Sequence, residues 1–479
     1  MYKLSHYNSY IPISAEKSLI YNSFNNSLFE IDTPLSSILK EMQLMNTFDF
    51  SRITDHDKSI LLKEGYIVDR SKNEQEIVCQ TKQRFLKNVR KNSRSIGLTL
   101  LITNSCNLNC AYCFEGKEKP KTKMDESVLG KILEFITFKK AESSISRLSL
   151  SWYGGEPLMY PNMVQNYAKK IKDLCNNLDI KLTSSIVTNG VNLNKKNLEI
   201  LQEAGVENIQ ITIDGDKETH DRRRPFVHSN KSSFDLILNN LEEIAGIIPI
   251  SIRINVDKEV YPGIQELFKK LINRKIWPHK KNVKLYLGFT CATKEFDDNK
   301  LFTAEEFSFA VSEFRKMKIK IYNEWAKENN LPFARFKFKY PVVTNNYCMS
   351  YSGLNSFVID ANGNISKCWE HINNPDVVIG NVSQGITNAT RSDKFKKIEE
   401  NCLIPQNCVA CKSLPICEAK FCPNDDFKLK PNRCSFWKYQ IEECLREQYL
   451  MQKERPELIE SYEAVDEMYN SGNFMGFEM

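Results

Sequence analysis

Three cysteines near residue 110 are spaced for metal chemistry. Cys106, Cys110 and Cys113 form a Cys-x3-Cys-x2-Cys pattern directly after a strand-like stretch at 97–103. Three thiolates on one short loop can bind three irons of a [4Fe-4S] cluster and leave the fourth iron open. A zinc site would need a fourth protein ligand, and the neighbouring sequence offers none. The spacing therefore favours an iron-sulfur cluster with one open iron.

The overall composition is compatible with such a cluster. The chain has 479 residues, of which 41% are hydrophobic and 26% charged, as in a globular protein of roughly three domains. It shows neither a secretion signal nor an apolar run that could span a membrane, so we expect a cytoplasmic protein without membrane association. Its 15 cysteines should then be reduced, and clustered thiols should bind metal. The net charge of +6 does not require nucleic acid as a partner.

Alternating strand-like and helical stretches follow the first strand. The predicted strands are at 97–103, 147–153, 182–188, 208–213, 250–256 and 283–289. Helical patterns separate them at 128–140, 162–176, 195–204, 232–245 and 264–274. Six β-α units in succession predict an α/β fold, a partial (β/α)6 barrel with parallel strands. The cysteine loop lies at the carboxyl end of the first strand, where such barrels place their chemistry.

The regions on either side of these units have a different character. Residues 1–95 show strand-like stretches, two helical stretches and a last strand, an order that predicts a winged-helix-like domain. Residues 301–344 have the pattern of a helical bridge. Residues 345–445 lose periodicity and are rich in cysteine, as in a domain organised by metal. We therefore predict domains at 1–95, 96–300, 301–344 and 345–445, followed by a tail at 446–479.

The cysteine loop, with the aromatic Tyr112 before its last cysteine, resembles that of the radical S-adenosylmethionine (SAM) superfamily. In that family the open iron chelates the amino and carboxylate groups of SAM. The stretches Gly154-Gly155-Glu156-Pro157, Thr188-Asn189-Gly190, Thr212-Ile213-Asp214-Gly215, His220-Asp221-Arg222-Arg223-Arg224 and Ile252-Arg253-Ile254-Asn255-Val256 resemble later family motifs, in the family's order. Each is weak alone, and they reinforce one another behind the cysteine loop.

The resemblance implies a SAM site at these strand ends. Gly154, Gly155 and Glu156 would receive the SAM ammonium group. Thr188 and Asn189 would lie near the ribose, Thr212 and Arg224 near the ribose and carboxylate, and the backbone of Asn255 and Val256 near the adenine. The implied SAM contacts are Tyr112, Gly154, Gly155, Glu156, Thr188, Asn189, Thr212, Asp214, Arg224, Asn255 and Val256. We identify no catalytic side chain beyond the cluster ligands.

A second group of cysteines resembles the SPASM domain, a C-terminal extension of radical SAM enzymes that mature peptides and proteins. The resemblance implies two auxiliary [4Fe-4S] clusters. Cys348, Cys368 and Cys422 would bind the first, and Cys408, Cys411, Cys417 and Cys434 the second. A zinc or purely structural role for this region is the alternative. The remaining thiols, Cys79, Cys175, Cys291 and Cys444, have no partner in any pattern, and we interpret them as ordinary buried thiols.

Two departures from the SPASM pattern concern the first auxiliary cluster. Four residues separate Cys417 from Cys422, where the family usually has three. The family's extra cysteine shortly after the first is also missing, because that stretch reads 349-MSYSGL-354. Either this cluster has an open iron, which could bind a substrate thiolate, or Cys402 fills the position.

Residues 1–95 resemble, in the order of their elements alone, the recognition element that binds leader peptides of ribosomally synthesised and post-translationally modified peptides (RiPPs). An ordinary N-terminal cap on the barrel is the alternative. Together the resemblances imply a radical SAM/SPASM peptide maturase with an external electron donor such as flavodoxin or ferredoxin. The expected substrate is a ribosomal precursor peptide with a leader. The expected product is a cysteine thioether, as in sactipeptides or ranthipeptides.

Other chemistries remain open on the same scaffold. They are carbon-carbon cross-linking, epimerisation, maturation of a sulfatase-type residue and action on a small molecule. An iron-sulfur binding or sensing protein without SAM turnover is the alternative of a different class. The Gly154-Gly155-Glu156 stretch disfavours it, because an electron carrier needs no site for the SAM ammonium group.

Overall fold

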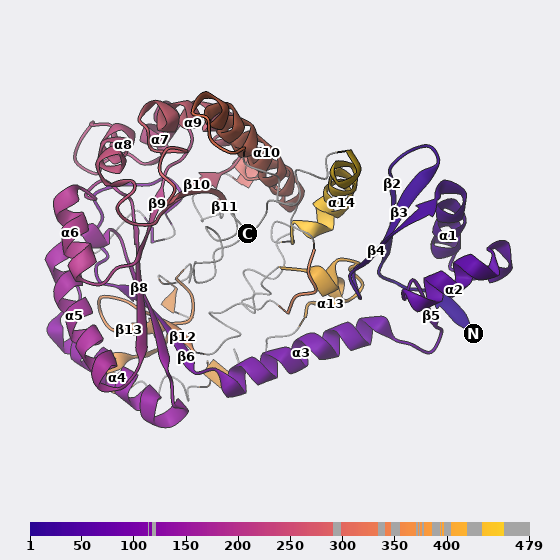
Figure 1. Cartoon of the computed structure of the whole chain (residues 1–479). Coiled ribbons are helices and arrows are strands. Elements are labelled where there is room, and N and C mark those ends of the chain that lie inside the picture. The colour runs from indigo at the N-terminus through magenta and orange to yellow at the C-terminus, as the bar shows by residue number, and fades with distance from the viewer. Residues whose placement is uncertain are drawn as a thin grey trace. The chain divides into compact units, whose positions relative to one another are not determined.

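The structure is a computed structural model, shown in Figure 1. It describes residues 1–113, 115–116, 121–290, 298–333, 341–345, 355–369, 372, 374–375, 378–385, 393, 395–396, 404–418 and 434–454. The chain divides into two compact units. The sheet unit comprises Arg90–Phe302 and Met349–Asn401, and the terminal unit comprises Met1–Val89, Thr303–Cys348 and Cys402–Met479. Within the described ranges, no helix has the length and apolar character needed to cross a membrane.

Six parallel strands lie side by side in chain order in the sheet unit. They are β6 (Ser95–Leu101), β7 (Arg147–Tyr153), β8 (Lys181–Thr188), β9 (Asn208–Thr212), β10 (Ile250–Val256) and β11 (Val283–Phe289). The connecting helices are α4 (Glu126–Ser143), α5 (Pro161–Asn177), α6 (Lys195–Glu203), α7 (Lys217–Arg223), α8 (Ser233–Ile244) and α9 (Ile264–Asn273). Short 3-10 turns lie at Pro157–Met159, Tyr261–Gly263 and Asp298–Lys300. The predicted α/β fold with parallel strands is confirmed.

The spacing of apolar residues explains how these layers pack. In α9, Leu267, Phe268 and Leu271 recur at helical spacing and are buried. In β7, the buried residues Leu148 and Leu150 alternate with partly exposed ones. Figure 1 shows the helices along one side of the curved sheet. The helix-covered face therefore forms the core, and the other face stays partly accessible.

A further strand extends the parallel sheet beyond β6. β12 (Ser356–Ile359) pairs in parallel with β6, and β13 (Asn364–Ser366) and β14 (Val378–Asn381) follow in antiparallel order, before a turn at Val382–Gln384. β12 and β13 form an antiparallel hairpin. Its pairing with β6 could not be predicted, because a four-residue apolar run does not identify its partner strand.

The terminal unit begins with a small antiparallel sheet. β2 (Asn8–Pro12), β3 (Lys17–Asn22) and β4 (Ser27–Asp32) pair in that order. The elements that follow are α1 (Thr33–Met45), a 3-10 turn at Phe50–Arg52, α2 (Asp55–Lys63) and β5 (Ile67–Asp69), which pairs with β1 (Tyr2–Leu4). The strand-like and helical stretches expected here are present, and the winged-helix classification stays a prediction.

The helix α3 (Glu74–Asn92) was not predicted from the sequence. Only Glu74, Val78 and Lys82 of this 19-residue helix are buried, and they are spaced four residues apart. A buried stripe this narrow, with two charged members, produces no apolar periodicity. Hydrophobic spacing therefore could not reveal the helix.

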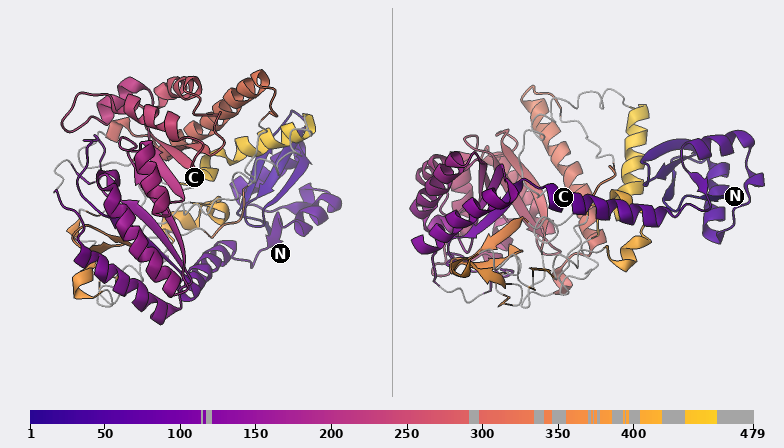
Figure 2. Two further views of the ribbon diagram at one scale, coloured as in Figure 1. Left: turned by 60° about the vertical axis from the view of Figure 1, so that its left-hand side comes forward. Right: turned by 90° about the horizontal axis from the view of Figure 1, so that it is seen from below.

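Both ends of the chain contribute to the core of the terminal unit. α14 (Trp437–Glu454) lies beside the small sheet in both views of Figure 2. It packs through Trp437, Ile441 and Leu445 against Ile11 and Tyr21 of that sheet. α10 (Ala304–Glu328) contacts α14, and the short elements α13 (Gln406–Val409) and η8 (Leu414–Ile416) complete this unit. Residues 1–89 thus form one unit with C-terminal segments, and the domain borders proposed from the sequence stay predictions.

Candidate active site

The loop that carries Cys106, Cys110 and Cys113 leaves the carboxyl end of β6. Backbone hydrogen bonds anchor it to the segment after α7, with Asn109 N donating to Pro225 O at 2.8 Å and Ala111 N to Arg223 O at 2.9 Å. All three cysteines are in the thiol form and partly exposed. The loop is therefore held by its backbone, which leaves the thiols available as ligands.

Two glycines let the end of β7 approach this cysteine loop. Gly155 N donates to Thr103 O at 2.9 Å, and Glu156 N donates to Ser105 O at 2.9 Å. A Cβ atom added to Gly155 would lie 2.3 Å from Ser105 O, and one on Gly154 would lie 2.4 Å from Thr103 O. Gly154 also has a φ of +116°, which disfavours other residues. These glycines are needed for the contact between the two loops.

The carboxylate of Glu156 connects the ends of β7 and β8. It is completely buried. Its Oε1 accepts hydrogen bonds from Thr188 Oγ1 at 2.7 Å and Leu158 N at 2.8 Å, and its Oε2 accepts one from Asn189 N at 2.7 Å. Burial raises the pKa of Glu156, and these hydrogen bonds oppose that effect. Both oxygens thus have protein partners, and the expected contact with the SAM ammonium group stays a prediction.

Asn189 connects the end of β8 to the cysteine loop. Its Nδ2 donates to Asn107 Oδ1 at 2.7 Å and lies 3.9 Å from Cys106 Sγ. Its Oδ1 accepts a hydrogen bond from Val191 N at 2.9 Å, which fixes the orientation of the amide. The side chain predicted to lie near the SAM ribose therefore also braces the first cysteine.

Four of the predicted SAM contacts meet at the phenol oxygen of Tyr112. Arg224 Nη1 donates to it at 2.5 Å and Asn255 Nδ2 at 3.1 Å, while the phenol donates to Asp214 Oδ2 at 2.5 Å. Burial raises the pKa of Tyr112 well above its usual value, so the hydroxyl keeps its proton. Burial also raises the pKa of Asp214, against the effect of the Arg224 charge. This arrangement joins the cysteine loop to β9, α7 and β10.

Arg223 belongs to the same network, although the sequence analysis did not select it. Its side chain is 3% exposed, and its Nη1 lies 2.9 Å from Asp257 Oδ2. Its Nε lies 3.7 Å from Asp214 Oδ2, and its guanidinium stacks over the Tyr112 ring with the centroid 5.0 Å away. The run of three arginines after His220-Asp221 was the available signal. Sequence alone could not tell which of them turn inward.

His220 and Arg253 form hydrogen bonds to members of this network, and neither was predicted as a site residue. His220 Nδ1 accepts a hydrogen bond from Asp214 N at 3.1 Å, so the ring carries its proton on Nε2. Arg253 Nε donates to Asn255 Oδ1 at 2.7 Å. Burial lowers the pKa of His220 well below its usual value, which keeps the ring neutral.

Thr212 and Val256 lie at the carboxyl ends of β9 and β10. Thr212 is 8% exposed and aligns with Arg253 on the neighbouring strand. Val256 is buried, and its carbonyl accepts a hydrogen bond from Thr290 N at 3.4 Å. Both residues lie at the same strand-end edge as the Tyr112 network, and their contacts with SAM stay predictions.

The residues at this edge fit a cluster and a SAM molecule. The donor set is three accessible thiols next to buried polar groups of both charges. Asp214 Oδ1 and Arg224 Nε are buried and have no hydrogen-bond partner in the part of the chain that the structure describes. Since buried polar atoms are normally paired, a polar ligand would satisfy them.

Four cysteines of the second group lie in the terminal unit. Cys408 is on α13, Cys411 and Cys417 flank the turn η8, and Cys434 precedes α14. Burial raises the pKa of Cys408 to about 11, and the charges of Cys417, Cys411 and Cys434 add to that effect. Lys438 Nζ donates to Cys434 Sγ at 3.5 Å. Four cysteines are the number of ligands that a [4Fe-4S] cluster takes, and the second auxiliary cluster stays a prediction.

The structure does not test every cysteine assignment. Cys368 is partly exposed and follows β13, whereas Cys348, Cys422, Cys402 and Cys291 lie outside the described residues. No three His, Cys, Asp or Glu side chains among the described residues could hold a single metal ion. Cys175 is buried, and Cys79 and Cys444 are partly buried. The ligands of the first auxiliary cluster therefore stay predictions.

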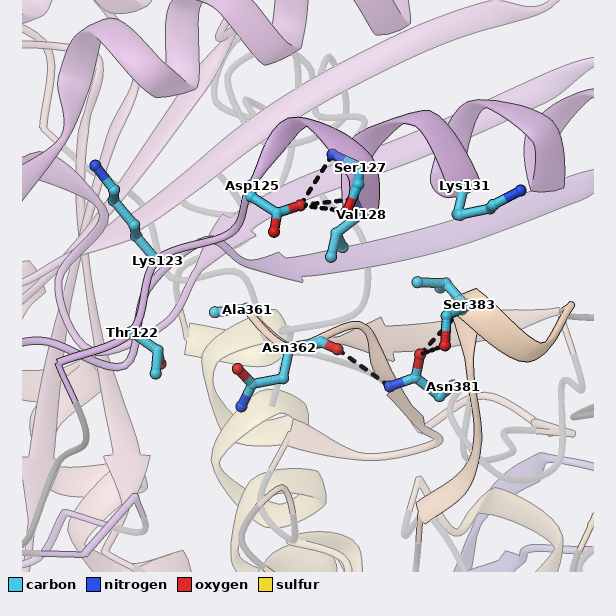
Figure 3. A pocket seen from close by; sticks show the side chains of 11 residues that line it. Thr122, Lys123, Asp125, Ser127, Val128, Lys131, Ala361, Asn362, Asn381 and Ser383 are labelled. Carbon is cyan, nitrogen blue, oxygen red and sulfur yellow. Dashed lines mark hydrogen bonds between the residues drawn. The ribbon is translucent and has the colours of Figure 1, made fainter.

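A polar cavity of about 500 Å³ lies elsewhere in the sheet unit, between the start of α4 and the turns beside β13 and β14 (Figure 3). Asp125 Oδ1 accepts hydrogen bonds there from Ser127 N and Val128 N, and Asn381 Nδ2 donates to Asn362 O. Asp125 thus caps α4, and Asn381 joins the two turns. None of the predicted site residues lines the cavity, and we assign it no function.

Comparisons with known proteins agree with this geometry. Residues 100–271 match the radical SAM superfamily. Radical SAM cyclopropyl synthase TigE from Paramaledivibacter caminithermalis is 25% identical over 42% of this chain and 46% of its own length. Sporulation killing factor maturation protein SkfB from Bacillus subtilis is 24% identical over 37% of this chain and 40% of its own length. The chain spans about half the length of the curated relatives it matches.

Among solved structures, native anSMEcpe with bound AdoMet and Cp18Cys peptide superposes with a TM-score of 0.53. It is 17% identical and covers 78% of this chain and 99% of its own, so the likeness concerns the fold. Residues 100–271, which include the cysteine loop, Glu156 and the Tyr112 network, form a radical SAM domain.

Proposed function

We propose that this chain, with its radical SAM domain, is a peptide maturase that forms a cross-link in a ribosomal precursor peptide. One observation carries the proposal, namely that the cysteine loop, the Glu156 carboxylate and the Tyr112 network meet at one edge of a parallel sheet. When bound, the cluster and SAM supply a 5′-deoxyadenosyl radical that takes a hydrogen atom from an unactivated carbon.

The residues of the chain would hold and orient these groups. Cys106, Cys110 and Cys113 would bind the cluster through their thiolates. Arg224, fixed by Tyr112, would face the SAM carboxylate, because a guanidinium pairs well with that group. The strand-end residues are buried, so they would limit the access of water to the radical.

A peptide substrate is supported by the relatives and by the N-terminal elements. SkfB is named as a maturation protein for a killing factor. In the terminal unit, β4 is an edge strand of the small sheet and exposes Phe29, which is 42% accessible. We propose that a leader peptide pairs with such an edge, since extended peptides add to exposed strands.

The bond formed is proposed to be a cysteine thioether, in which a substrate thiolate would bond to the substrate carbon radical and the surplus electron would pass to an auxiliary cluster. One observation favours a second candidate, a carbon-carbon bond, because the similar TigE is named a cyclopropyl synthase. Epimerisation and sulfatase-type maturation would use the same radical domain and differ in the fate of the carbon radical.

Electron transfer would involve the second group of cysteines. We propose that Cys408, Cys411, Cys417 and Cys434 bind one auxiliary cluster, and Cys348, Cys368 and Cys422 a first one that has an open iron or a fourth ligand in Cys402. We further propose a cytoplasmic flavodoxin or ferredoxin as electron donor. The four interacting thiols of the terminal unit support the assignment of the second auxiliary cluster.

The test of the bond is the intact mass of a cysteine-bearing precursor peptide encoded beside the gene, co-expressed anaerobically and then alkylated. A thioether removes about 2 Da per cross-link and one alkylation per cross-linked cysteine. The same mass loss with every thiol still alkylated would establish a cross-link that does not involve cysteine sulfur. An unmodified peptide with every candidate precursor would contradict the proposed cross-linking activity.

A further inference from the structure

Lys82 is a buried ammonium group near the middle of α3. It is 8% exposed, although lysine is almost never buried without a counter-charge. Its Nζ donates to Thr344 O at 2.5 Å. No ion pair joins it to a carboxylate of any described residue. Since burial of an unpaired charge is strongly unfavourable, a negative group should lie beside it.

The hydrogen bond to Thr344 places Lys82 beside the cysteines of the terminal unit. Thr344 N donates to Pro415 O at 3.0 Å, and Pro415 precedes Cys417 by two residues. Burial lowers the pKa of Lys82, and the charges of Cys417 and Cys79 oppose that effect. The negative charges that can compensate Lys82 are therefore those of nearby cysteine thiolates, Cys417 first among them.

Apolar packing holds α3 against the same segment. Val78, one turn before Lys82, packs with Tyr7 and Leu414 in a buried cluster that also contacts Cys408 and Cys411. The elements that carry Lys82 and the cysteines thus belong to one packed core. Lys438, in the first turn of α14, contacts the same group of cysteines through Cys434 Sγ.

We infer that Lys82 is the counter-charge of the second auxiliary cluster and raises its reduction potential. The inference rests on the proposed function, which places that cluster on Cys408, Cys411, Cys417 and Cys434. One-electron reduction adds a negative charge to the cluster, and a fixed ammonium group in a buried environment stabilises that charge. Lys82 acts on the cluster through its positive charge and is a positioning residue. The segment proposed to recognise the precursor thereby helps to set the potential of the cluster.

The test is an anaerobic redox titration of the reconstituted full chain, followed by electron paramagnetic resonance. In the parent protein, Cys106, Cys110 and Cys113 are alanine and Cys368 is serine, which leaves the second auxiliary cluster as the remaining proposed site. Lys82→Gln removes the charge and keeps a donor for Thr344 O. It should shift the midpoint to a more negative potential.

Three further variants make the result specific. Lys82→Met, a second neutral variant, should give the same negative shift, and Lys82→Arg should return the midpoint toward that of the parent. Lys87→Gln, on an exposed position of the same helix, should leave the midpoint unchanged.

An unchanged midpoint in both neutral variants would overturn the inference and leave the cluster assignment standing; Lys82 would then serve only Cys79, one turn back on α3. Absence of any cluster signal and bound iron in the parent would overturn the cluster assignment itself, and the inference with it.

Discussion

At the scale of single residues, the polar side chains of the site act first on one another. Tyr112 joins Arg224, Asn255 and Asp214, and Glu156 joins the ends of two strands. Buried polar groups that bond to one another give a rigid site, and here Asp214 Oδ1 and Arg224 Nε stay without a hydrogen-bond partner among the described residues. Such a site would hold SAM in one orientation without rearrangement on binding, because its donors and acceptors are already fixed.

The sequence predicted which residues lie at this edge, because their motifs follow successive strand ends. It did not predict their mutual hydrogen bonds. These depend on the register that aligns Thr212 with Arg253, and on which arginines of the run 222–224 turn inward. Neither feature is encoded in residue spacing.

Glu156→Gln should destabilise the sheet unit by about 1–3 kcal/mol. The amide nitrogen would face one of the donors Thr188 Oγ1, Leu158 N or Asn189 N and leave it without an acceptor. Chemical denaturation monitored by circular dichroism measures the effect. The control is Glu134→Gln, whose side chain is 68% exposed and which should change stability by less than about 0.5 kcal/mol. Equal stability of both variants would show that the Glu156 carboxylate does not hold β7 and β8 together.

At the scale of elements, the sequence predicted the bounds of several strands better than it predicted which strands pair. Strands β7, β10 and β11 begin and end where the apolar pattern places them. The pairing of β12 with β6 and the helix α3 were missed, since one depends on a distant segment and the other buries too few apolar residues. A strong apolar periodicity identifies a helix or strand from the sequence. An element with weak periodicity depends on tertiary contacts, which the local sequence does not reveal.

Gly155→Ala should displace the cysteine loop from the end of β7. Its new Cβ would lie 2.3 Å from the backbone oxygen of Ser105, a group that cannot move without the loop. We expect the variant to lose most of the iron bound by Cys106, Cys110 and Cys113, measured after reconstitution in a background where the second-group cysteines 368, 408, 411, 417 and 434 are serine.

The matched control is Gly130→Ala in the middle of α4, where an added Cβ meets no atom within 4 Å. It should keep its iron and gain about 0.5–1 kcal/mol of stability, as expected for alanine in a helix. Full iron content in Gly155→Ala would show that the close approach of the two loops is not required for the cluster.

At the scale of the whole molecule, segments far apart in sequence build the terminal unit. Ile11 and Tyr21 near the start of the chain share a core with Trp437 and Leu445 near its end. The sequence analysis treated the N-terminal elements as a separate domain, because each part has its own local pattern. Contacts between segments hundreds of residues apart are invisible to such patterns.

Trp437→Ala should destabilise the terminal unit by about 3–5 kcal/mol, as expected for truncation of a large buried aromatic residue. Because this residue packs on the N-terminal sheet and follows Cys434 by three residues, iron should also be lost from the proposed second auxiliary cluster. Denaturation and iron content are the measurements, with Phe309→Ala, 52% exposed on α10, as the control. If Trp437→Ala lost no more stability than the control, this shared core would not stabilise the N-terminal sheet and the segment that carries the cysteines.

The central claim is that the loop of Cys106, Cys110 and Cys113 supports reductive cleavage of SAM. The most direct measurement is the 5′-deoxyadenosine formed by the anaerobically reconstituted protein with SAM and dithionite. We expect formation by the natural sequence and none after replacement of the three cysteines by alanine. Cys175→Ala, remote from the loop in sequence and buried on α5, should keep the activity. Undiminished formation without the three cysteines, or none with them in place, would show that this loop does not support SAM cleavage.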